Sequence, residues 1–182
     1  MVKNITDRLN VVQSKLCVGF RTHIAASCDD YYSLAICNLI YGGGTESKLF
    51  QNVREKESMA YYIYSRVDKF KALMIVSCGI EQKNKDRVLN LIKQQLDDIR
   101  NKKISDDEFN SAVRYYIDSI KQVQDGQRTL SEFYLGQMLC GIDLSIDEII
   151  NKIKSVTVDS VAEAAKKIQL DTVYFLTSEG EG

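Results

Sequence analysis

Hydrophobic and polar residues alternate from position 16 to position 24, which predicts a half-buried β-strand. A second strand runs through residues 61–67, residues 68–71 form a turn, and the apolar run 72–80 returns as the other half of a hairpin. Because that run is almost unbroken, we expect it in the middle of the sheet with both faces covered. Residues 172–177 predict a closing strand, and the polar residues 1–14 are a connector or an edge piece.

Apolar residues recur every three or four positions in the other segments, as they do in amphipathic helices. Ser27 with Asp30 approximates a capping box for a first helix. A serine is followed three residues later by a glutamate at positions 105 and 145, which predicts two more capping boxes, and Thr157 can cap a last helix. With Gly126 as an interruption, the expected helices cover residues 27–41, 83–101, 105–123, 130–139, 145–153 and 157–168.

This order of strands and helices mixes a hairpin with crossovers, so the predicted fold class is α+β. We expect a two-layer αβ roll, in which a mostly antiparallel sheet carries the helices on one face. The chain has 182 residues, about the length of one domain, and it contains no proline to mark a linker. Residues 1–182 are therefore expected to form a single domain.

A run of three glycines gives the chain its most distinctive stretch, and we call these residues the glycine loop: Gly42, Gly43 and Gly44. Glycine permits a sharp reversal of the chain, or a close backbone approach that a Cβ atom would block. A phosphate-binding loop would end in Gly-Lys-Ser/Thr, and neither that motif nor G-x-G-x-x-G after a strand occurs here. A tight connection is therefore the preferred interpretation.

A short amphipathic segment follows the glycine loop and leads into a tyrosine-rich strand. Thr45 or Ser47 can cap the start of this segment. Its apolar face is made by Leu49, Phe50 and Val53. Arg54 and Tyr61 lie at opposite ends of the exit from the segment, and the pair is our first candidate for a functional site.

This stretch resembles the C-terminal-type domain of the inverted-zincin peptidases, the family of pitrilysin, insulinase and the mitochondrial processing peptidase. The resemblance rests on the glycine loop, on Ser-x-Leu-Phe at residues 47–50, on Val-Arg-Glu at residues 53–55, and on the six residues between Arg54 and Tyr61. Residues 13–20 are also similar to the first strand of that domain, so the resemblance covers essentially the whole chain. It implies the same αβ roll. The zinc motif of the family, His-x-x-Glu-His, needs two histidines, and this chain has only His23.

By this resemblance, Arg54 and Tyr61 reach across to a zinc-bearing peptidase domain, where they hydrogen-bond a peptide substrate and help to stabilise the oxyanion. A permanently charged guanidinium and a phenol donor suit that role. The glycine loop would face the cleft, and zinc would be bound by the partner domain and not by this chain.

The resemblance thus implies a non-catalytic, substrate-binding half of a processing-type endopeptidase. By the same resemblance, we expect the chain to be one repeat cut from a longer protein and to be inactive alone. The alternative is a catalytically silent scaffold or partner-stabilising subunit. The apolar surface that faces the partner half in this family also predicts a homodimer.

The other polar residues have simpler interpretations. His23 with Cys28 or Cys37 lacks the three well-spaced ligands of a zinc site, and nothing marks a cysteine beside it as an activated nucleophile. The cysteines are odd in number and form no C-x-x-C pair, which argues against a disulfide framework: Cys17, Cys28, Cys37, Cys78 and Cys140. Four of the five lie inside apolar segments, which favours free core-filling thiols there.

Tyrosines cluster at two places, in the strand with Tyr61, Tyr62 and Tyr64 and at the pair Tyr115 and Tyr116. They line a peptide groove, or they are ordinary strand residues and, for Tyr116, part of a helix core stripe. An exposed sheet edge in this region would bind an extended peptide by strand addition.

Composition narrows the classes of partner. The apolar fraction of 45% and the charged fraction of 27% are ordinary for a globular protein. A net charge of −1 without a long basic run gives no electrostatic footprint for nucleic acid. No stretch approaches the roughly 18 apolar residues of a membrane span, and the polar N-terminus lacks the apolar core of a secretory signal, so a cytoplasmic location is expected.

Overall fold

The computed structural model describes residues 2–179 and contains an open five-stranded sheet in the order β1-β5-β2-β4-β3. Its strands are β1 (Lys3–Arg8), β2 (Ser14–Arg21), β3 (Ala60–Asp68), β4 (Leu73–Ile80) and β5 (Gln169–Thr177). β1 pairs with β5 in parallel, and the other neighbouring pairs are antiparallel. The predicted mostly antiparallel sheet is confirmed.

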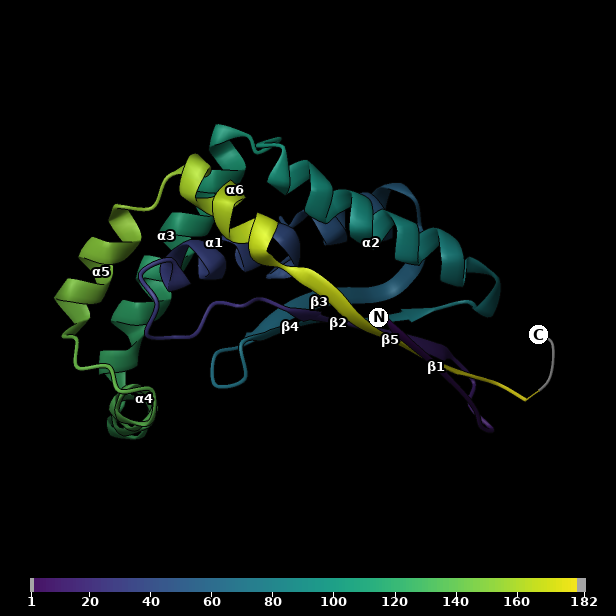
Figure 1. The fold of residues 1–182 in the computed structure, drawn as a ribbon, viewed down its shortest axis with the longest axis horizontal. Helices are drawn as coiled ribbons and strands as arrows, with labels where there is room; N and C mark the ends of the chain where they lie inside the picture. Colours follow the sequence, from purple (N-terminus) through teal and green to yellow (C-terminus); the bar gives the residue numbers. More distant parts are fainter. Residues whose placement is uncertain (1, 180–182) are drawn as a thin grey trace.

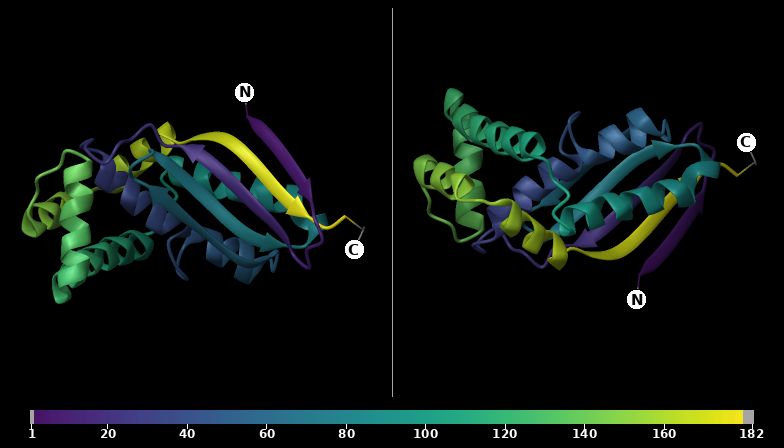
Figure 2. Two further views of the ribbon diagram at one scale, coloured as in Figure 1. Left: turned by 90° about the horizontal axis from the view of Figure 1, so that it is seen from below. Right: turned by 90° about the horizontal axis from the view of Figure 1, so that it is seen from above.

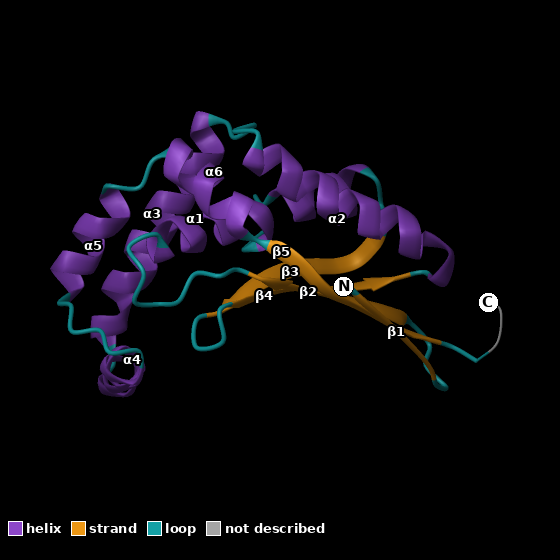
Figure 3. Ribbon diagram, viewed as in Figure 1, coloured by secondary structure: helices purple, strands orange, loops and turns teal. Residues whose placement is uncertain are grey.

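The helices lie on one side of this sheet, while its other face stays open (Figures 1 and 3). Helices α1, α2 and α6 cover the sheet, and α3, α4 and α5 gather beyond one end of it, as the views from below and above show (Figure 2). The helices are α1 (Tyr31–Gly42), α2 (Lys85–Arg100), α3 (Asp106–Gln122), α4 (Gln127–Leu139), α5 (Ile146–Lys154) and α6 (Val158–Lys167), with the π-helix η1 (Phe50–Lys56) and the 3-10 turns η2 (Gln82–Asn84) and η3 (Val123–Asp125). The predicted α+β fold with two layers is confirmed.

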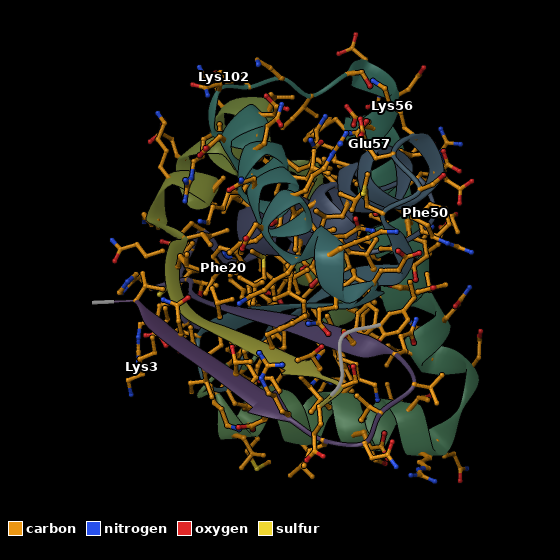
Figure 4. The ribbon with its side chains drawn as sticks, turned by 90° about the vertical axis from the view of Figure 1, so that its right-hand side faces the viewer. Lys3, Phe20, Phe50, Lys56, Glu57 and Lys102 are labelled. Atoms are coloured by element: carbon orange, nitrogen blue, oxygen red, sulfur yellow. The ribbon has the colours of Figure 1, made fainter. Side chains whose placement is uncertain are left out.

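One core fills the space between the sheet and its helices. The alternation on β2 holds, because Leu16, Val18 and Phe20 are buried against the helix layer, and Phe20 lies between the sheet and the helices (Figure 4). The helix side supplies the fully buried Ile92 and Leu96 of α2. Within the described residues, no helix is both long and apolar enough to cross a membrane.

The helix caps were largely visible in the sequence. The capping boxes at Ser105 and Ser145 are both formed with the predicted glutamates, and Thr157 caps α6. The box expected at Ser27 is wrong, because α1 begins only at Tyr31 and its N-cap residue, Asp30, makes no side-chain cap bond. The Asp30 carboxylate instead accepts a hydrogen bond from Lys167, 2.6 Å away.

Two strand boundaries differ from the predicted ones. β2 ends at Arg21 and not at residue 24, because His23 has a φ of 56°, which breaks the pleat. The closing strand is longer than predicted and begins at Gln169. Within residues 1–14, for which the sequence leaves a connector or an edge piece open, Lys3–Arg8 forms the edge strand β1.

The expectation that strand 72–80 is covered on both faces is wrong. β4 pairs on both sides, with β2 and β3, but β2 is the central strand of the sheet. Met74 and Val76 are buried under the helices, whereas Leu73 and Ile75 are half-exposed on the open face. The run looks continuous because apolar residues also occupy these open-face positions.

Tyr41 ties α1 to α2 in the core, and its removal gives a test of this packing. The side chain is fully buried, and its hydroxyl donates to the backbone oxygen of Ile92 at 2.8 Å. We expect Tyr41→Phe to lower the free energy of unfolding by about 1 kcal/mol in urea titrations. Tyr134→Phe, on the exposed face of α4, is the matched control and should leave it unchanged. Equal stabilities of the two variants would contradict this role.

Candidate functional site

The glycine loop lets the last turn of α1 lie directly against strand β3. A Cβ atom at Gly42 would lie 2.6 Å from Ser65 Oγ and 2.8 Å from Ser65 N, and one at Gly43 would lie 2.7 Å from Leu39 Cα. A Cβ atom at Gly44 would meet nothing within 4 Å. The first two glycines therefore serve a close approach of the backbone and not a left-handed turn, since Gly43 itself has a φ of −83°.

The segment after the loop is a π-helix, η1, which the sequence predicts only as a short amphipathic segment. Such helices are rare and are frequently found at functional sites. Leu49 and Val53 are fully buried. Ser47 Oγ accepts from the Phe50 amide at 3.4 Å, so Ser47 rather than Thr45 caps the short turn that leads into η1, whose own N-cap residue, Leu49, makes no side-chain cap bond. Figure 4 shows Phe50 and Lys56 on the outside of the helical layer.

Polar contacts fix η1 to two other helices. Asn52 Nδ2 donates to Oε1 of the buried Gln95 on α2 at 2.6 Å. Glu57, directly after η1, pairs with Arg87 of α2. Lys48, two residues before η1, pairs with Glu108 of α3 at 2.8 Å. η1 is therefore held at both ends and in its middle.

Glu108 has two structural roles at once. Its Oε2 accepts from the Ser105 amide at 2.8 Å in the capping box, while its Oε1 pairs with Lys48. Burial raises the pKa of the Glu108 carboxyl, but the hydrogen bonds from Lys48 and Ser105 outweigh burial and hold that pKa below its ordinary 4.5. The ionised carboxylate thus links α3 to the start of η1.

Arg54 presents its guanidinium at the surface of η1. The side chain is 41% exposed, and its Cζ lies 4.6 Å from the centre of the Phe50 ring. Its ion pair within the described residues is with the neighbouring Glu55, at 3.8 Å between Nε and Oε1. The phenylalanine ring and the neighbouring carboxylate orient the guanidinium and leave donors facing solvent.

Tyr61 occupies a β-bulge at the start of β3. Ala60 pairs with Ile80 and Tyr62 with Gly79, so Tyr61 is the extra residue between them. A bulge redirects a side chain and is common beside active sites. Tyr61 is 59% exposed and lines a pocket with Gln13 and Lys83. The bulge turns outward a side chain that regular alternation with Ile63 would direct under the helices.

The structure does not gather the predicted residues in one pocket. Tyr61 lines a pocket at the end of the sheet, whereas Gly43 and Gly44 line another, against α3. Arg54 lines neither of these two pockets. Within one domain, the Arg54 and Tyr61 side chains are separately exposed, and a common target would have to contact both from outside.

His23 and the cysteines belong to no cluster of three or more possible metal ligands in the described part of the chain. His23 Nε2 lies 3.3 Å from Gln169 Oε1. Burial raises the pKa of the Cys37 thiol to about 12, so this thiol stays protonated at neutral pH. All five cysteines are free: Cys37 and Cys78 are buried and Cys17 and Cys140 half-buried, as core-filling thiols would be, while Cys28 is exposed.

The clustered tyrosines fall into two groups, one packed against the core and the others exposed. Tyr116 packs against the core, while Tyr115 is exposed. Tyr62 and Tyr64 stack on the open sheet face with ring centres 6.2 Å apart. β3 is an edge strand, as strand addition would require, and η1 lies beside it (Figure 2).

Sequence reasoning missed Lys48 and Lys83. The Ser105 capping box pointed to Glu108, but its pairing with Lys48 joins residues far apart in the chain, and no local spacing signals it. Lys83 stands beside Tyr61 in the same pocket, and its hydrogen bond to Glu81 raises the pKa of its ammonium, to which Tyr61 adds a smaller contribution.

Comparison with known proteins shows the family to which this chain belongs. The model of the peptidase M16 inactive domain matches residues 3–116, which include the glycine loop, η1, Arg54 and Tyr61. The chain belongs to this family. It is thus a non-catalytic domain of the M16 zinc-protease type, in agreement with the resemblance that the sequence motifs carry.

Individual M16 relatives support the assignment. The chain is 37% identical over 174 residues to the probable inactive metalloprotease YmfF of Bacillus subtilis. The alignment covers 96% of this chain and 41% of that protein. It is 28% identical over 148 residues to an uncharacterized zinc protease of Streptomyces coelicolor, covering 80% of this chain and 32% of that protein. The chain therefore spans less than half the length of these relatives.

Solved structures have the same fold. A conserved protein from Enterococcus faecalis superposes with a TM-score of 0.94 at 35% identity, covering 100% of this chain and 43% of that one. A peptidase M16 inactive domain from Pseudomonas fluorescens superposes with a TM-score of 0.79 at 17% identity, and the match covers 98% of this chain and 44% of that one. The second likeness concerns the fold alone.

The two ends of the glycine loop give a matched pair of substitutions. Gly42→Ala forces a methyl group against the Ser65 backbone, so we expect a loss of about 1–3 kcal/mol in the free energy of unfolding. Gly44→Ala adds a methyl group in open space and should change it by no more than about 0.5 kcal/mol. Thermal and urea unfolding of both variants measure this. The opposite ranking would contradict the close approach of α1 and β3.

Glu108 gives a prediction about pH. Because its folded-state pKa lies below the ordinary 4.5, its stabilising contribution is complete above pH 4.5 and is lost as the pH falls through the folded-state value. Glu108→Gln keeps a capping side chain but loses the charge paired with Lys48, so we expect a loss of about 1.5 kcal/mol at pH 7. The difference from the unmodified chain should shrink below pH 4.5. A difference that stays constant down to pH 3 would refute this role.

Proposed function

We propose that this M16 domain binds an extended peptide substrate and completes the active site of a zinc-bearing peptidase domain. The observation that carries the proposal is the joint exposure of Arg54 and Tyr61, one on the anchored η1 and one in a β-bulge. Both elements direct polar donors outward from rigid supports. Membership of the M16 family supports a peptidase domain as the partner.

Zinc does not fit the residues of this chain. The family motif needs two histidines and the chain has one, and the described residues hold no cluster of three or more His, Cys, Asp or Glu side chains. In the proposal, zinc belongs to the partner domain and supplies the metal chemistry there. The partner is either the remainder of a longer chain or a separate subunit.

Arg54 and Tyr61 would act as hydrogen-bond donors to the substrate. The guanidinium offers several N–H groups in a rigid fork and keeps its charge at any working pH. The Tyr61 phenol donates one hydrogen bond, and its exposed position allows it to reach a peptide carbonyl. Donors preorganised around a carbonyl oxygen stabilise the negative charge that develops when water attacks the peptide bond.

A catalytically silent scaffold is the second candidate. Its support is the exposed apolar side chains of Leu135, Met138 and Leu139 on α4, which extends beyond the end of the sheet (Figure 1). Surfaces of this kind mark protein interfaces. A domain of this type would stabilise a partner or a second copy of itself, without a role for Arg54 or Tyr61.

Substitution of the two donors separates these functions. In the assembly of this domain with its zinc-bearing partner, whether one chain or two subunits, Arg54→Lys or Tyr61→Phe should lower kcat for an internally quenched peptide by roughly 10²- to 10³-fold. Assembly, followed by size-exclusion chromatography, should not change. Arg128→Lys and Tyr134→Phe on α4 are the matched controls and should keep full turnover. Unchanged turnover of the Arg54 and Tyr61 variants would favour the scaffold.

A further inference from the structure

A second pocket lies beside the glycine loop, and neither Arg54 nor Tyr61 lines it. It is formed by the end of α1, the glycine loop and one face of α3, and it has a volume of about 300 Å³. Its walls are largely apolar and include Leu39, Ile40, Ala112 and Tyr115. This volume is at the lower end of the range for ligand pockets, about 300–1,000 Å³, which suits one large side chain with its flanking backbone.

The loop glycines keep this pocket open. Gly43 packs against the backbone of Leu39, and Gly44 has no neighbour within 4 Å of the Cβ position, so no side chain from the loop enters the space. On the opposite wall, Glu108, Ser111, Ala112 and Tyr115 share one face of α3, because they are spaced by three and four residues. The pocket is therefore a gap between two fixed elements.

The charges around the pocket favour a positively charged neighbour. Of its two carboxylates, Glu108 is neutralised by Lys48 at 2.8 Å. Glu46 is exposed and takes part in no ion pair within the described residues. An apolar pocket with one unpaired carboxylate at its border complements an apolar group that is followed by a cation.

We propose that this pocket binds a large apolar side chain of a polypeptide, next to a lysine or arginine that pairs with Glu46. The inference rests on the proposed function in one respect, since it takes the ligand to be a polypeptide. It adds a site separate from Arg54 and Tyr61, because neither residue lines this pocket. The pocket thus selects the sequence of the bound chain at a distance from the two donors.

Fluorescence anisotropy with defined peptides tests this pocket. The probe is a fluorescein-labelled decapeptide of Gly-Ser repeats with Phe-Lys at its centre, and the comparison peptides carry Ser-Lys or Phe-Glu there. The protein is this domain assembled with its zinc-bearing partner, whether one chain or two subunits. We expect the Phe-Lys probe to bind about tenfold more tightly than the Ser-Lys peptide and several-fold more tightly than the Phe-Glu peptide.

Variants on α3 locate the binding. Ser111→Phe fills the pocket from an exposed helix position and should weaken binding of the Phe-Lys probe about tenfold. Asn110→Phe adds the same bulk one residue away, outside the pocket lining, and should have no effect. Glu46→Gln should abolish the preference for Phe-Lys over Phe-Glu. Circular dichroism confirms that each variant is folded.

Three outcomes would overturn the proposal: equal binding of the Phe-Lys and Ser-Lys peptides, binding that Ser111→Phe leaves unchanged, and self-association that Ser111→Phe abolishes, which would show a second copy in the pocket. The last is measured by sedimentation. Failure of the proposed function is distinct, because it appears as unchanged turnover in Arg54→Lys, whatever the Phe-Lys probe does.

Discussion

The close contact between the end of α1 and strand β3 is the constraint on which the rest of the site depends. At Gly42 the distance to the Ser65 backbone leaves no room for a side chain. Because the chain leaves α1 at this point, Leu49 and Val53 reach the core and η1 lies along the sheet edge. A displaced α1 would displace η1, and with it the Arg54 side chain.

Around this contact the molecule combines anchored backbone with exposed side chains. η1 is joined to α2 through Asn52 and to α3 through Lys48, while Arg54 on the same helix keeps its guanidinium at the surface. Functional groups held on fixed elements need less reorganisation when a ligand binds. The arrangement suits a domain that presents donors to a site assembled with a partner, as the M16 family assignment implies.

Local patterns predicted much of this fold, and contacts between distant residues explain the remainder. The capping box at Ser105 and the glycine loop were visible because each depends on a few neighbouring residues. The bulge at Tyr61 was not, because it exists only in the register of β3 against β4. Likewise, pairing of β1 with β5 joins the two ends of the described chain, and the open face of β4 depends on where the helices pack.

The most direct measurement is a crystal structure of this domain assembled with its zinc-bearing partner, whether one chain or two subunits, and a phosphinic peptide whose phosphinyl oxygens imitate the oxyanion. The account predicts that the Arg54 guanidinium and the Tyr61 hydroxyl both lie within about 3.2 Å of the bound inhibitor. Both side chains pointing to solvent, with the inhibitor held by the zinc-bearing domain alone, would contradict it.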